Sequence, residues 1–147
     1  MKFQASGFSV EVPDEAIDAS AYTFSYPGLG SLPPNIVIQF EFGDDVDMGA
    51  RRAEVLERIE SSYPQVDIRV QDEVRSRGDW EYFTIVAEFG EGEARMVQKQ
   101  LQLRAQQPKP TVYVFSGTDL ASNFPVFEPH FDAMVRSFQP NEVQRVN

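Results

Sequence analysis

The chain has 147 residues, 23 of them acidic and 13 basic, so its formal net charge at pH 7 is -10. This length suits one domain with a real core, and a hydrophobic fraction of 41% argues against disorder. The acidic balance excludes nucleic acid and anionic lipid surfaces as expected partners, because their phosphates would repel the chain. The absence of cysteine excludes disulfides, thiolate metal sites and cysteine nucleophiles, and it agrees with a cytoplasmic protein.

The first residues, MKFQASGFSVEV, alternate as in a strand and lack the apolar segment of a signal peptide. No later run is as long as a membrane span, so we expect no direct membrane insertion. Phe8, Val10 and Val12 alternate with polar residues and predict a short strand that ends at Pro13.

A second strand is predicted from Ser20 to Tyr26, where large and small side chains alternate. We expect the bulky face to pack on the core and the small face to stay smooth. The bulky face contains Tyr22, Phe24 and Tyr26, and the small face contains Ala21, Thr23 and Ser25. A Gly- and Pro-rich loop follows, and a third strand begins near Ile36.

The first helix is predicted from Met48 to Tyr63, with Asp47 as its N-cap and Pro64 as its stop. Its apolar positions fall on one stripe. They are Val55, Leu56, Ile59 and Tyr63. This stripe suits packing on a sheet and binding a partner equally well, and the sequence leaves both readings open.

A fourth strand is predicted to begin with Val66, Ile68 and Val70 and to reach a turn at Arg77-Gly78-Asp79, which leads into a fifth strand from Trp80 to Phe89. The fifth strand is largely apolar on both faces and is therefore expected to be central. A turn at residues 90–92 leads into RMVQKQLQLR, Arg95 to Arg104. Here Gln98, Gln100 and Gln102 share one face while the aliphatic residues face a core. Amides both donate and accept hydrogen bonds, so this row suits a face that binds something uncharged; the alternative is a strand exposed to solvent.

The last strand is predicted from Thr111 to Ser116, and a closing helix is predicted from Phe124 to Phe138, capped by Ser122 or Asn123. These elements predict an α+β fold, with an antiparallel sheet of about six or seven strands and two helices. We expect one domain over residues 1–139, followed by a polar tail over residues 140–147.

The sequence contains little material for catalysis or metal binding. His130 is the only histidine, and a packing or surface role is expected for it. Asp44, Asp45 and Asp47 are close together, but they lack the spacing of a calcium loop and are interpreted as a solvated loop with a helix cap. We therefore expect no enzyme, no cofactor and no metal site.

Six pieces of the chain, in order and spacing, resemble the DcrB-like family. They are VPDEAIDAS (Val12 to Ser20), NIVIQF (Asn35 to Phe40), a helix closing on Tyr63-Pro64, the hairpin Gly78-Asp79-Trp80, Gln98-Lys99-Gln100, and VRSF (Val135 to Phe138). The chain looks like the members of that family that are Eag chaperones of type VI secretion. The resemblance implies a PsbP-like fold and a small cytoplasmic homodimer that shields the hydrophobic N-terminal transmembrane helices of a secreted effector before export.

Under that resemblance, a client-binding surface is expected from small, apolar and amide side chains, because these imitate a neighbouring membrane helix. The expected residues are Ala21, Thr23, Val55, Ile59, Tyr63, Gln98, Gln100 and Gln102. The alternative function is a small-molecule or accessory protein-binding module on the same fold, which predicts a closed pocket instead of an open face.

Overall fold

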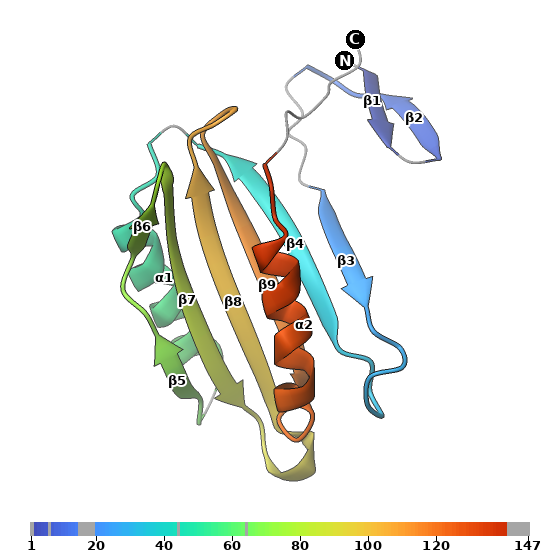
Figure 1. Cartoon of the computed structure of the whole chain (residues 1–147), viewed down its shortest axis with the longest axis vertical. Helices are drawn as coiled ribbons and strands as arrows, with labels where there is room; N and C mark the ends of the chain where they lie inside the picture. The colour runs from blue at the N-terminus through green and yellow to red at the C-terminus, as the bar shows by residue number, and fades with distance from the viewer. Residues whose placement is uncertain (1, 6, 15–19, 44, 64, 141–147) are drawn as a thin grey trace.

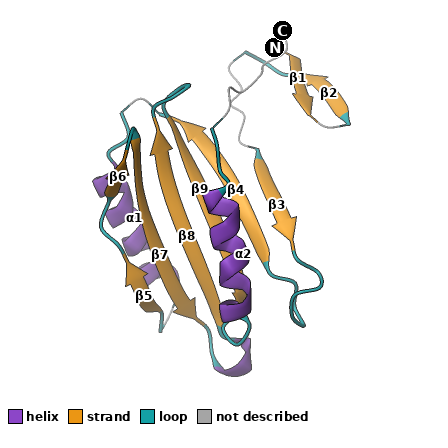
Figure 2. Cartoon of the chain, viewed as in Figure 1, coloured by secondary structure: helices purple, strands orange, loops and turns teal. Residues whose placement is uncertain are grey.

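The computed structural model describes residues 2–5, 7–14, 20–43, 45–63 and 65–140. It is an α+β structure, as expected, with a seven-stranded antiparallel sheet and one helix on each of its faces (Figure 1). A separate two-stranded hairpin projects away from this sheet (Figure 2). No helix in the described ranges is long and apolar enough to cross a membrane. Asp44, Pro64 and the expected tail beyond residue 140 lie outside the described residues.

The strand order of the large sheet is β3-β4-β9-β8-β7-β5, and β6 also pairs with β7. In chain order the elements are β1 (Lys2–Ala5), β2 (Phe8–Glu11), β3 (Ala21–Ser25), β4 (Asn35–Phe42), α1 (Met48–Ser62), β5 (Asp67–Gln71), β6 (Arg75–Arg77), β7 (Trp80–Phe89), a 3-10 turn (Gly92–Ala94), β8 (Met96–Ala105), β9 (Thr111–Leu120) and α2 (Phe124–Arg136).

Two apolar clusters, one on each face of the sheet, hold the fold together. On the side that we call the α1 face, Val55 and Ile59 pack against Phe83 and Ile85. On the opposite side, the α2 face, a second cluster packs below α2. Its buried members are Ile36, Val86, Val97, Phe115, Phe124, Phe127 and Phe131. Each fully buried side chain of this size contributes about 1.5–3 kcal/mol.

The helices form where the sequence predicted them, for local reasons. The Asp47 side chain accepts a hydrogen bond from the backbone N–H of Ala50 at 3.1 Å and so caps α1. Asn123 is the N-cap of α2 by position, but its side chain makes no capping bond there. It donates instead to the carbonyl of Leu29 and to Asp119, which ties the β3–β4 loop to the start of α2.

Strand β9 continues to Leu120, four residues beyond the predicted end. Gly117, the residue after the predicted end, is needed for contact with α2: a Cβ at this position would lie 2.5 Å from Phe131 Cδ2 and 3.1 Å from Phe127. Alternation alone could not reveal this close approach of helix and sheet.

The expectation that the bulky face of β3 packs on the core was wrong for two of its three aromatic residues. Tyr22 is 54% exposed and Phe24 is 47% exposed. Only Tyr26, just past the strand, packs below α2, with its ring 5.9 Å from Phe127 and 5.3 Å from His130. The reason is the position of β3 at the edge of the sheet, two strands away from β9, on which α2 packs.

Candidate binding face

The pairing register aligns side chains of five strands into three rows across the α1 face. Directly opposed residues of antiparallel strands point to the same side of a sheet. The rows are Ala21–Gln39–Val114–Gln102–Phe83, Thr23–Val37–Ser116–Gln100–Ile85, and Ser25–Asn35–Thr118–Gln98–Ala87. The glutamine row that the sequence predicted is therefore one column of a larger array.

Helix α1 covers only one end of these rows. Phe83, Ile85 and Ala87 are buried in the cluster below the helix, whereas all of β3 is exposed. We call the uncovered remainder the open face. It consists of Ala21, Thr23, Ser25, Asn35, Val37, Gln39, Ser116, Thr118, Gln98 and Gln100.

None of these ten side chains is charged, although 24% of the chain is. Charged residues begin in the next row, where Glu41 is opposite Val112 and Val112 is opposite Arg104. The open face therefore consists of small aliphatic, hydroxyl and amide groups. Such a surface can exchange hydrogen bonds with a partner without the large desolvation penalty of an ion.

The three glutamines differ in their surroundings. Gln102 is only 2% exposed, and its Oε1 accepts a hydrogen bond from Arg51 Nε, while Arg51 is also paired with Glu41. Gln98 donates weakly to the Thr118 hydroxyl at 3.4 Å. Gln100 is half-buried and makes no side-chain hydrogen bond with any described residue. Gln100 is therefore the amide best placed to bind a partner.

The structure separates the residues that the sequence grouped as a client site. Ala21, Thr23, Gln98 and Gln100 are together on the open face, and Gln102 is buried at its border with α1. Two members of the apolar helix stripe, Val55 and Ile59, are buried in the core, so packing on the sheet accounts for them. Tyr63, the remaining stripe residue expected at the client site, is 37% exposed and stacks on Phe89 with ring centroids 4.3 Å apart.

Sequence reasoning missed the contributions of β4 and β9. Val37, Gln39, Ser116 and Thr118 belong to the open face because β4 and β9 separate β3 from β8 in the sheet. Each strand showed its own alternation, but the order of the strands gave no local signal.

The described residues contain no group of three or more histidine, aspartate or glutamate side chains that could hold a metal ion. His130 is exposed on α2 beside Tyr26, on the side of the sheet opposite the open face. The side chains of the open face are neutral hydrogen-bonding groups and small apolar groups.

A recess of about 340 Å³ lies on the α2 face, between α2 and strands β5 and β7. Val70, Val86 and Leu101 line it, with Lys99 beside them. Lys99 Nζ is 2.8 Å from Asp132 Oδ1 and 3.0 Å from Glu128 Oε2. Burial alone would lower the pKa of Lys99, but hydrogen bonds and charge attraction from the two carboxylates outweigh it and raise this pKa above its ordinary value.

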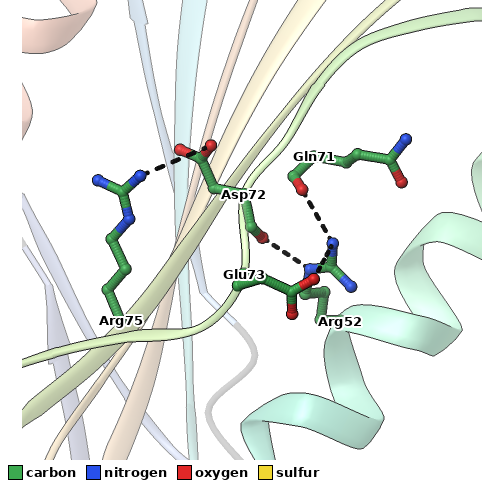
Figure 3. A network of polar contacts seen from close by, with 5 residues as sticks. All are labelled: Arg52, Gln71, Asp72, Glu73 and Arg75. Atoms are coloured by element: carbon green, nitrogen blue, oxygen red, sulfur yellow. Dashed lines mark hydrogen bonds and ion pairs between the residues drawn. The ribbon is translucent and has the colours of Figure 1, made fainter.

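Arg52 fastens α1 to the chain between β5 and β6 (Figure 3). Its Nε donates to the carbonyl of Asp72 at 2.7 Å and its second terminal nitrogen donates to the carbonyl of Gln71 at 2.9 Å. The same nitrogen is 3.7 Å from Glu73. A planar guanidinium can donate hydrogen bonds to two neighbouring carbonyls at once. These bonds hold the N-terminal part of α1 against the sheet edge farthest from β3.

Several solved structures share this fold. PA94 from Pseudomonas aeruginosa, a protein of unknown function proposed as a regulator, aligns over 97% of this chain and 98% of its own, with a TM-score of 0.74 and 16% identity. LpqN from Mycobacterium tuberculosis, involved in cell envelope biogenesis, aligns over 80% of this chain and 82% of its own, with a TM-score of 0.52 and 13% identity. No family model and no curated protein matches the chain. At these identities the likeness establishes the fold alone.

Proposed function

We propose that this protein is a cytoplasmic chaperone of the DcrB-like family that binds the apolar N-terminal helices of a type VI secretion effector before export, and that it acts as a homodimer. The single observation that carries the proposal is the open face, an uncharged array of small, hydroxyl and amide side chains in a chain with a net charge of -10.

The physical argument concerns what an apolar helix needs outside a bilayer. Membrane helices associate through small residues that allow close approach and through Ser, Thr, Asn and Gln side chains that form hydrogen bonds between helices. The open face offers these residue types in three rows, and Gln100 has an amide available to pair with a client hydroxyl or backbone carbonyl. Each such bond contributes about 1 kcal/mol.

The first test uses a defined probe, a labelled peptide of about 20 Leu and Ala residues with one central Ser, long enough for a membrane span. Fluorescence anisotropy should show binding to the wild-type protein, and Thr23→Asp should weaken it at least about 30-fold, because a desolvated carboxylate costs about 2 kcal/mol or more. Ser76→Asp is the matched control: it adds the same charge to exposed β6, near the opposite edge of the sheet.

The second test uses the native client. The tagged N-terminal segment of an effector with apolar N-terminal helices, taken from a neighbouring gene where one encodes it and expressed with the chaperone, should co-purify with wild type and with Ser76→Asp but not with Thr23→Asp. Equal recovery with all three proteins would refute the open face as the binding site.

A second candidate function is a small-molecule binding module. The recess beside Lys99 favours it, because about 340 Å³ lies at the lower end of the size of small-ligand sites. The two functions use opposite faces of the sheet. Leu101→Trp would fill the recess and leave the open face unchanged, so loss of function in this variant, with Thr23→Asp fully active, would favour the module.

A further inference from the structure

The β1–β2 hairpin exposes apolar surface. Among the described residues its strands pair only with each other, from Lys2 opposite Glu11 to Ala5 opposite Phe8. Phe8 is 60% exposed and Val10 is 46% exposed, and their spacing places both on one face of the hairpin. A two-stranded hairpin is at best marginally stable in water unless it packs on something.

The edge strand β3 exposes a second apolar surface. Tyr22 and Phe24 are about half exposed on the α2 face, and β3 ends the order of the described sheet, so its outer edge is not paired there. Exposed edge strands with apolar side chains are templates for contact with another chain.

The distribution of charge indicates that the partner is a second copy of this chain. No charged residue occurs from Ser20 to Phe40, the segment that forms β3 and most of β4. Two copies with a net charge of -10 each repel one another, and their contact is least unfavourable where both surfaces are neutral. This neutral ribbon is where a second copy can approach.

We propose that two copies exchange their hairpins, so that the Phe8–Val10 face of one hairpin packs on Tyr22 and Phe24 of the partner's β3. A two-fold axis makes this contact twice, because each copy supplies one hairpin and one β3. Both apolar surfaces of each chain are then covered. Figure 1 shows the hairpin beyond the start of its own β3 and apart from it, an arrangement that suits exchange between copies.

This inference rests on the homodimer in the proposed function and assigns its interface. The contact uses the side of β3 that faces away from the open face, since Tyr22 and Phe24 alternate with Thr23. Each open face therefore stays free in the dimer. Alternate residues of one short strand would serve assembly and client binding separately.

Cysteine crosslinking tests the exchange directly, because the chain contains no cysteine of its own. V10C and F24C are made as separate proteins and mixed under mild oxidation. We expect a disulfide-linked species of about twice the 16.7 kDa chain mass from the mixture, and at least tenfold less of it from either protein alone. Crosslinking of F24C to itself would indicate pairing of two β3 edges and overturn the exchange.

The double variant V10C/F24C distinguishes exchange from a hairpin that folds back on its own chain. Exchange predicts covalent dimers from this variant, whereas an intrachain disulfide at monomer mass would refute it. Both positions are exposed, so the core is untouched, and the thermal midpoint of each variant verifies folding.

Analytical ultracentrifugation separates this inference from the proposed function. Phe24→Asp should raise the dimer dissociation constant at least tenfold, while Thr23→Asp, which adds the same charge on the other face, should leave it unchanged. Wild-type protein that stays monomeric at micromolar concentration overturns the inference. A crosslinked dimer that fails to bind the Leu–Ala peptide overturns only the proposed function.

Discussion

Replacement of each β8 glutamine by alanine should separate binding from stability, because the three amides have different surroundings. Gln100 has no side-chain hydrogen-bond partner among the described residues, whereas Gln102 is 2% exposed and accepts a hydrogen bond from Arg51. Gln98 has one long hydrogen bond to Thr118. If the open face only met water, Gln98→Ala and Gln100→Ala would leave peptide affinity unchanged, whereas Gln102→Ala would still cost stability.

The expected magnitudes follow from these contacts. Under the proposed function, Gln100→Ala removes one hydrogen bond to the client, about 1 kcal/mol, which is about fivefold in the dissociation constant, and it should leave the free energy of unfolding unchanged. Gln102→Ala removes a buried acceptor from a charged donor and leaves a small cavity. It should cost about 2 kcal/mol of unfolding free energy, or about 6–8 °C in Tm for a chain of this length. Gln98→Ala should change both quantities by less than about 0.5 kcal/mol.

The assay is a thermal unfolding curve and a peptide anisotropy titration on each variant, at the same protein concentration. Gln71→Ala is the matched control, because its exposed side chain is on β5 at the far edge of the sheet. A fall in Tm for Gln100→Ala as large as that for Gln102→Ala would refute the reasoning. So would unchanged peptide affinity in the Gln98/Gln100 double alanine variant.

Three further predictions concern the framework. Lys99 binds its proton more tightly in the folded state than in the unfolded state. Its contribution to the free energy of unfolding is therefore complete below about pH 10.5 and is lost as pH rises through its raised pKa. Lys99→Met should therefore show a smaller alkaline loss of Tm, and Tyr113, whose pKa is raised by burial, contributes to the loss that remains. Gly117→Ala should cost about 1–3 kcal/mol in urea unfolding, because the new methyl group would overlap the Phe131 ring. Arg52→Ala should cost about 2 kcal/mol and speed hydrogen exchange selectively in β5, and Arg52→Lys should restore little of this.

The sequence predicted those parts of the fold that depend on local patterns. The strand Trp80–Phe89 has the predicted bounds, and α1 begins after the predicted cap at Asp47. Both follow from periodicity and from one capping side chain, which are properties of a short segment. The fourth strand, predicted to begin at Val66 and to reach the turn at Arg77, is divided in the structure into β5 and β6. Residues Arg75–Arg77 carry no apolar pattern, so no local signal marked this division.

The candidate site was predicted only in part, because it depends on which strands are neighbours. The sequence showed that Thr23 and Gln100 face a definite side of their own strands, but not that Val37 and Ser116 lie between them in one row. It also could not show that α2 stops short of β3. The exposure of Phe24 follows from that distance and not from any local feature.

The chemistry of the open face also explains how such a surface can stay available in an unoccupied protein. An apolar face of this extent would associate with other exposed apolar surfaces, and a charged face would lose several kcal/mol when a helix displaced its water. Hydroxyl and amide groups such as those of Thr23 and Gln100 are solvated when the face is empty. They cost about 1–3 kcal/mol each to bury without a partner. A client helix offsets this free-energy cost only where its own small and hydroxyl residues lie opposite the hydroxyl and amide groups of the open face. The open face should therefore discriminate among apolar segments by the positions of their polar groups, so that moving the single Ser of the probe peptide by two residues, to the far side of the helix, would weaken binding about fivefold at constant hydrophobicity.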